Sequence, residues 1–179
     1  MALALLATAM TALAQSNIRK VDFKNLEYKL SCGTADRASK IQVTNGEYRG
    51  PKGGLDVYLK VYEIRYGDLD NDEEEEAVIL YSCGSGASYV YFRGLIYSIR
   101  RGRPVLITEL EGGNKGDGGF YEVQIRNHQL VVERYQLRQA AGSPCCPESI
   151  EKVAYKLKDK KLIRVGRAFV RKLPKTTQE

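Results

Sequence analysis

Short turn signals recur along this chain, and each stands between two segments rich in strand-forming residues. Asn45-Gly46 is the strongest, because both central positions of a type I′ hairpin turn need positive φ, which Asn and Gly adopt readily. Further turns are expected at Arg101-Gly102-Arg103, at Asn127-His128 and over residues 158–161. The pattern predicts a mainly β chain, a single antiparallel sandwich or open barrel of about nine or ten short strands joined by hairpins.

Two segments give the clearest strand patterns. Residues 56–66 read DVYLKVYEIRY, where Val57, Leu59 and Val61 alternate with other residues at the period of two of a half-buried strand. Residues 76–83 read EAVILYSC, and this continuous apolar run is typical of a strand buried on both faces. At this length we expect one domain with a sizeable core.

The first fourteen residues, MALALLATAMTALA, carry no charged side chain and end in Ala12-Leu13-Ala14. Small residues at the first and third positions of that triplet fit a signal-peptidase site, although no basic region precedes the apolar stretch. We therefore expect a signal peptide over 1–14, a single β domain over 15–172 and a flexible tail over 173–179. The mature protein is expected to be secreted or periplasmic, with no membrane span. The alternative is a buried N-terminal helix.

Export would place the four cysteines, Cys32, Cys83, Cys145 and Cys146, in an oxidising compartment, where an even number is typical of disulfides. Cys145 and Cys146 are adjacent, and neighbouring side chains of an extended segment point to opposite faces. We therefore expect them to bond to different partners, namely Cys32 and Cys83. The alternative is a vicinal Cys145–Cys146 bridge, which would be strained and could be redox-active.

The formal net charge is +6, and the basic excess lies in residues 148–179. There the basic residues are interleaved with apolar ones such as Val153, Leu157 and Val165, the pattern of a hairpin with one solvated face. Exposed lysines also discourage edge-to-edge pairing of strands. Because an exported protein meets little nucleic acid, no nucleic-acid partner is expected. The partner is expected to be an unknown protein or a component of the cell envelope.

An acidic loop separates the two clearest strand patterns, where residues 66–77 read YGDLDNDEEEEA. Asp68, Asp70 and Asp72 alternate, and Glu76 follows Asp72 in the same segment. Ca²⁺ takes about six to eight oxygen ligands, mostly carboxylate and backbone carbonyl, and alternating aspartates in a tight turn can converge on one point. The loop therefore predicts a metal site formed by Asp68, Asp70, Asp72 and Glu76, with Ca²⁺ as the ion and no other cofactor.

The spacing is not that of an EF-hand, whose closing Glu stands at position 12 of the loop. That position here is Ile79, inside the buried strand, and the sixth position is Glu73 where an EF-hand has Gly. Asn71 tolerates the left-handed conformation and is expected to supply the turn instead. The alternative is a solvated acidic loop whose charge is balanced by the basic C-terminal hairpin.

The string GDLDNDEEEEAVI resembles the G-D-L-x-x-D-x-x-x-E-A strand–loop–strand of FG-GAP-type and VCBS-like extracellular modules. In those modules alternating acidic residues bind calcium, which implies the same role for Asp68, Asp70, Asp72 and Glu76. Most of the mature chain is similar to an uncharacterised group of exported bacterial β-domains with a Cys-Cys-Pro motif. The matching segments, with some departures, are residues 19–23, 112–119, 127–133 and 145–147. The resemblance implies no activity.

Catalytic schemes that need several histidines are excluded, because His128 is the only one. It lies in an expected turn, and no spacing identifies a nucleophile for it or singles out a pair of carboxylates for glycoside hydrolysis. We therefore assign no catalytic residue and expect a non-catalytic binding or structural module. The alternative is an exported hydrolase, or a thiol redox enzyme using Cys145 and Cys146.

Overall fold

A computed structural model describes residues 17–32, 38–52, 54–85, 89–114, 118–136 and 147–173. Within them eleven strands form three antiparallel sheets, none of which closes into a barrel, and the only helices are the short 3₁₀ turns Ile18–Lys20 and Phe23–Asn25. The strands are β1 (Glu27–Leu30), β2 (Ser39–Gln42), β3 (Glu47–Lys52), β4 (Leu55–Gly67), β5 (Glu76–Ser85), β6 (Tyr89–Arg100), β7 (Arg103–Asn114), β8 (Phe120–Arg126), β9 (Gln129–Gln136), β10 (Ser149–Lys158) and β11 (Lys161–Lys172).

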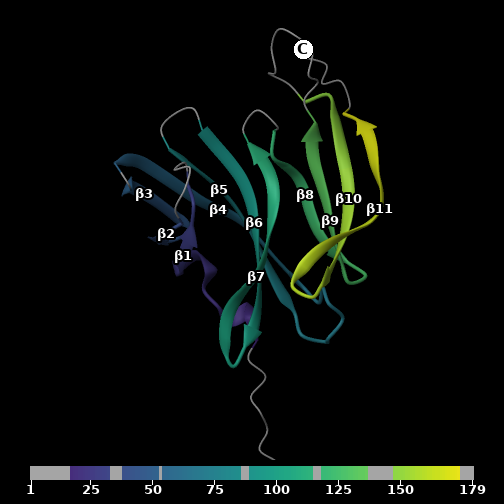
Figure 1. Ribbon diagram of the computed structural model, residues 1–179, viewed down its shortest axis with the longest axis horizontal. Coiled ribbons are helices and arrows are strands. Elements are labelled where there is room, and N and C mark those ends of the chain that lie inside the picture. Colours follow the sequence, from purple (N-terminus) through teal and green to yellow (C-terminus); the bar gives the residue numbers. More distant parts are fainter. Residues whose placement is uncertain are drawn as a thin grey trace, which may run out of the picture.

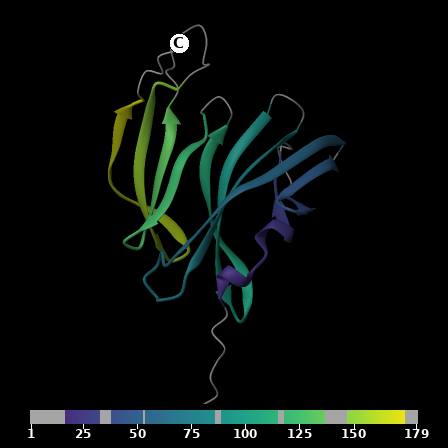
Figure 2. The same cartoon turned by 180° about the vertical axis from the view of Figure 1, so that it is seen from behind.

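The sheets are arranged in three layers (Figures 1 and 2). The central sheet has the order β3-β4-β5-β6-β7, the four-stranded sheet has the order β11-β10-β9-β8, and β1 pairs with β2 in the third. The mainly β, sandwich-like prediction is therefore confirmed. Four strands are longer than expected, with 12 or 13 residues each, namely β4, β6, β7 and β11.

Two cores lie on opposite faces of the central sheet, and β5 contributes to both. Ile79 faces the core that β1 and β2 cover, together with Tyr28 and Ile41. Val78 and Leu80 face the core shared with the four-stranded sheet. Six consecutive residues from the start of β5 are buried, so the prediction of a strand buried on both faces is confirmed.

Three of the expected turns, at residues 101–103, 127–128 and 158–161, close hairpins between β6 and β7, β8 and β9, and β10 and β11. The fourth, Asn45-Gly46, has the expected positive φ values of 52° and 85°. Its flanking segments nevertheless do not form a hairpin, since only Thr44 and Glu47 pair across the turn. The reason is that β2 pairs with β1 while β3 pairs with β4, so the turn passes the chain from one sheet to another.

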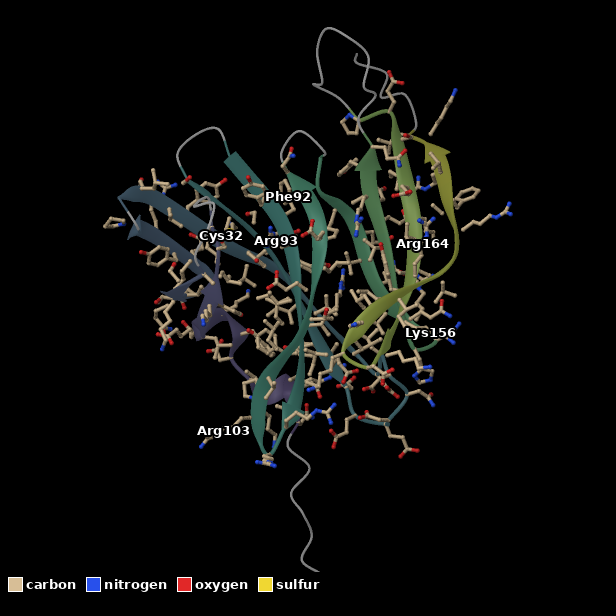
Figure 3. All side chains as sticks on the ribbon, viewed as in Figure 1. Cys32, Phe92, Arg93, Arg103, Lys156 and Arg164 are labelled. Carbon is tan, nitrogen blue, oxygen red and sulfur yellow. A yellow bond between two sulfur atoms is a disulfide. The ribbon has the colours of Figure 1, made fainter. Side chains whose placement is uncertain are left out.

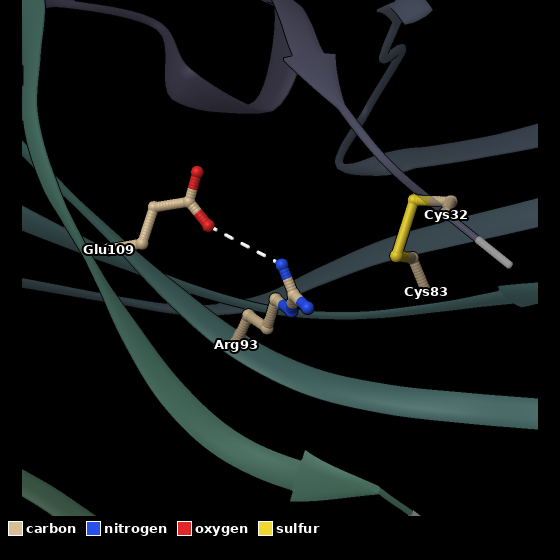
Figure 4. The surroundings of a disulfide bond; sticks show 4 residues. All are labelled: Cys32, Cys83, Arg93 and Glu109. Atoms are coloured by element: carbon tan, nitrogen blue, oxygen red, sulfur yellow. Dashed lines mark hydrogen bonds and ion pairs between the residues drawn. A yellow bond between two sulfur atoms is a disulfide. The ribbon is translucent and has the colours of Figure 1, made fainter. Parts of the chain in front are cut away.

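The predicted disulfide pairing is wrong for Cys32 and Cys83, because these two residues bond to each other (Figure 4). Their Cα atoms lie 5.4 Å apart, within the usual range for a disulfide. Both are buried, Cys83 on β5 and Cys32 just after β1, so the bridge joins the outer pair of strands to the central sheet. Sequence adjacency could not show this, because the pairing depends on where β1 crosses the central sheet.

Cys145 and Cys146, the expected signal peptide over 1–14 and residues 174–179 of the expected tail lie outside the described residues. Within the described ranges, no helix has the length and apolar character needed to cross a membrane. Lys156 and Arg164, labelled in Figure 3, are exposed on β10 and β11 of the four-stranded sheet. The basic C-terminal hairpin therefore presents charged side chains to solvent. The predicted division into one solvated and one buried face does not extend to β11, which has no buried residue and exposes Ile163, Phe169 and Val170.

Candidate functional site

The acidic loop connects β4 to β5, and the Asp68 carboxylate organises its backbone. Its Oδ1 accepts hydrogen bonds from the N–H groups of Asn71 and Asp72, at 2.7 and 3.3 Å, and its Oδ2 accepts one from Glu73 at 3.3 Å. Asn71 adopts the left-handed φ of 65° expected from the sequence, and Glu73 does so as well, with φ 70°. A side chain that caps three backbone donors holds the loop in a fixed tight turn.

Glu76 closes the loop at the first position of β5, and its side chain is completely buried. Its Oε2 accepts a hydrogen bond of 2.8 Å from the Leu69 N–H, whereas its Oε1 has no hydrogen-bond partner. The pKa of Glu76 is raised to about 7, chiefly because burial disfavours the charged form. The hydrogen bond from Leu69 lowers this pKa, and the nearby charges of Asp70, Asp72 and Asp68 raise it. A buried carboxylate oxygen without a partner costs free energy unless a proton or a cation compensates it.

Carboxylate oxygens of Asp68, Asp70 and Glu76 lie within 4.8 Å of one another. Burial raises the pKa of Asp70, and the charges of Asp72 and Asp68 raise it further. Oxygen-only ligands of this kind suit a hard cation, so this group could hold a metal ion. Asp72 is not part of the group, and its Oδ1 instead accepts a hydrogen bond from the Glu74 N–H at 2.9 Å. The structure thus brings together three of the four predicted ligands.

A cavity of about 150 Å³ lies behind this group, between the central and four-stranded sheets. Asp70 and Glu76 line it from one side, and Leu157, Asp159 and Lys160 line it from β10 and the β10–β11 turn. The remaining lining residues are Ser98, Arg100 and Ile107. Ser98 is 2% exposed and its Oγ has no hydrogen-bond partner. Sequence reasoning missed both Ser98 and Asp159.

His128 joins the β8–β9 turn to the acidic loop. Its Nδ1 lies 3.2 Å from the carbonyl oxygen of Asp68 and 3.3 Å from Asp68 Oδ2. A surface hollow of about 540 Å³ opens beside this contact, and its lining includes Asp70 together with Lys156 and Lys158 of β10. The imidazole therefore links the β8–β9 turn to a carboxylate of the candidate metal group.

Positive charge also reaches the loop from the N-terminal side. The Arg19 guanidinium forms two hydrogen bonds to Glu75, Nε to Oε2 at 2.6 Å and Nη2 to Oε1 at 2.8 Å. It also lies over the ring of Tyr66, with its central carbon 4.8 Å from the ring centroid. The basic C-terminal hairpin approaches the loop through Lys160, which lines the same cavity as Asp70 and Glu76. Two separate cationic segments thus partly balance the acidic loop.

Comparisons with known proteins give no match to a protein-family model, to a curated protein or to a solved structure.

Proposed function

We propose that the protein is a secreted or periplasmic, disulfide-stabilised β module of a binding or structural kind, whose acidic loop holds Ca²⁺. Asp68, Asp70 and Glu76 supply the carboxylate ligands, and the ion fixes the connection between β4 and β5. The partner is a protein or a component of the cell envelope. The observation that carries the proposal is the buried Glu76 Oε1, which has no hydrogen-bond partner and belongs to a group of three converging carboxylates.

The local chemistry supports calcium among the hard cations. The three converging carboxylates offer only oxygen ligands, which suits Ca²⁺ better than transition metals. Calcium also tolerates flexible coordination geometry, whereas Mg²⁺ requires near-ideal octahedral geometry. Extracellular calcium sites typically bind at 10⁻⁴–10⁻³ M, an affinity that suits a calcium-rich exterior.

The Cys32–Cys83 disulfide supports a location outside the cytosol, because disulfides persist in oxidising compartments. The apolar N-terminal segment that ends in Ala12-Leu13-Ala14 supports export independently. The bond joins two layers of the fold, and its cysteines are only 3% and 0% exposed. Such burial supports a structural role for this pair and makes it a poor thiol redox centre.

A calcium titration monitored by thermal unfolding tests the proposal. Ten millimolar Ca²⁺ is expected to raise the melting temperature of the wild type by about 3–10 °C relative to EDTA, given the affinity typical of extracellular sites. Asp70→Asn should abolish the rise, since it removes one charged ligand. Glu74→Gln is the matched control, because it removes one charge from an exposed position of the same loop and should keep the rise. Identical wild-type curves in Ca²⁺ and EDTA would exclude the ion.

A further inference from the structure

We propose that the ion is held between the two sheets, with Ser98 of β6 and Asp159 of the β10–β11 turn as additional oxygen ligands. This inference rests on the proposed calcium site and extends it, because the loop alone would fix only one strand connection. With ligands on both sides of the inter-sheet cavity, the ion would also fasten the C-terminal hairpin to the central sheet.

The first observation is that one carboxylate oxygen of Glu76 is free of hydrogen bonds. One oxygen of its carboxylate is used by the Leu69 N–H, and the other, Oε1, is buried without a partner in a residue that lines the cavity. At about 150 Å³ the cavity exceeds the roughly 30 Å³ that one water occupies in the liquid, so it admits an ion together with water.

The second observation is the position of Ser98. Ala77 pairs with Tyr97 across β5 and β6, so the next pair in this antiparallel register sets Glu76 opposite Ser98. Both point to the same face, because Val78 and Ile96 belong to the core shared with the four-stranded sheet. The Ser98 hydroxyl is buried and has no hydrogen-bond partner. A buried, unpartnered serine oxygen that lines the same cavity as Glu76 can serve as a neutral ligand for a hard cation.

The third observation is the carboxylate on the opposite side of the cavity. Asp159 is an exposed residue of the two-residue turn between β10 and β11, with φ 50°; it lies outside the converging group and lines the cavity together with Asp70 and Glu76. Arg100 and Lys160 also line it, so the carboxylates there are only partly balanced by fixed positive charge. A divalent cation would supply the rest. Asp70, Glu76, Ser98 and Asp159 line the cavity, and Asp68 belongs to the converging group with Asp70 and Glu76. Together with water, these side chains would supply the ligand number that Ca²⁺ requires once the β10–β11 turn brings Asp159 to the ion.

Titration calorimetry of the full chain with Ca²⁺, together with hydrogen–deuterium exchange, tests this arrangement. Asp159→Asn should weaken calcium binding about tenfold, and Ser98→Ala about threefold. Asn accepts the left-handed conformation of the turn, and alanine leaves no buried hydroxyl, so both variants should fold. Melting curves in EDTA check this. Asp56→Asn, an exposed change on β4, is the charge-matched control and should bind like the wild type.

The exchange experiment separates this inference from the proposed function. Calcium should slow exchange in residues 158–161 of the β10–β11 turn as well as in residues 68–76 of the loop. If the wild type binds calcium, while both variants keep its affinity and protection stays within 68–76, the inter-sheet ligands are wrong and the loop site remains. If the wild type binds no calcium, the proposed function fails as well.

Discussion

Glu76, the first residue of β5, and Ser98 of β6 line the same cavity, and each buries an oxygen that has no hydrogen-bond partner. Buried polar atoms of this kind are uncommon in folded proteins, since each loses its bonds to water without gaining another. Two of them in the lining of one cavity, together with the carboxylates of Asp70 and Asp159, indicate a position that the fold keeps available for a ligand. Because a buried, charged Glu76 without a ligand costs free energy, the stability of the calcium-free protein should depend on pH.

Glu76→Gln is expected to stabilise the calcium-free protein at pH 8 by up to about 3 kcal/mol. The pKa of Glu76 in the folded protein is about 7, above its ordinary value of 4.5, because burial disfavours the charged form. Protonated Glu76 therefore stabilises the fold below about pH 4.5, and this contribution is lost as the pH rises to about 7. The charged groups around it are Asp68, Asp70, Asp72, Arg100, Asp159 and Lys160.

Urea unfolding in EDTA at pH 4 and pH 8 measures this effect. The free energies of unfolding of the wild type and Glu76→Gln should differ little at pH 4. They should differ most at pH 8, where Gln avoids the buried charge. In the presence of Ca²⁺ the wild type should instead be the more stable protein, because Glu76→Gln lacks a ligand that the wild type uses. A variant less stable than the wild type at pH 8 in EDTA would show that the Glu76 charge is already compensated within the fold.

Asp68→Ala should destabilise the protein even without calcium, by about 1–3 kcal/mol, because the carboxylate accepts hydrogen bonds from three backbone N–H groups. Asp72→Ala is the control in the same loop, where the carboxylate accepts one hydrogen bond, from Glu74, and should cost less. Chemical unfolding of both variants in EDTA gives the comparison. Equal losses would mean that the loop conformation does not depend on Asp68.

Removing the disulfide with Cys32→Ala and Cys83→Ala together should cost about 2–4 kcal/mol. The bond closes a loop with a sequence separation of 51 residues, which restricts the unfolded chain, and it joins two layers of the fold. Guanidinium unfolding of the double variant against the wild type measures the loss. An unchanged midpoint would mean that the packing of β1 and β2 on the central sheet holds them without the covalent bond.

The sequence predicted the parts of this molecule that local pattern determines. The apolar run of β5, the left-handed turn at Asn71 and three converging carboxylates all follow from residues close together in the chain. Asp72, also predicted as a ligand, lies outside the group of three converging carboxylates and accepts a hydrogen bond from the Glu74 N–H. The position of Ser98 depends on the β5–β6 register, and no local pattern records it.

Long-range placement explains the other error as well. Four cysteines permit three pairings, and neighbouring positions in the sequence favour no particular partner across the fold. Cys32 reaches Cys83 because β1 lies over the central sheet, a relation set by the packing of Tyr28 and Ile41 against Ile79. The turn at Asn45-Gly46 shows the same limit, since its local geometry is as predicted while its strands belong to different sheets.

Gly112→Ala is expected to destabilise the protein by about 1–3 kcal/mol, because it would overpack the point where the chain leaves the central sheet. A Cβ at Gly112 would lie 2.5 Å from the Phe120 ring and 2.7 Å from the carbonyl oxygen of Phe92. The ring belongs to the four-stranded sheet and the carbonyl to β6, so neither can move without disturbing the contact between the sheets. Gly50→Ala is the control, since its added Cβ would meet only the end of the Tyr48 side chain, at 3.1 Å, and should change stability little. Thermal unfolding compares the melting temperatures of the two variants. A Gly112→Ala protein as stable as Gly50→Ala would show that the two sheets are packed less closely at this crossing.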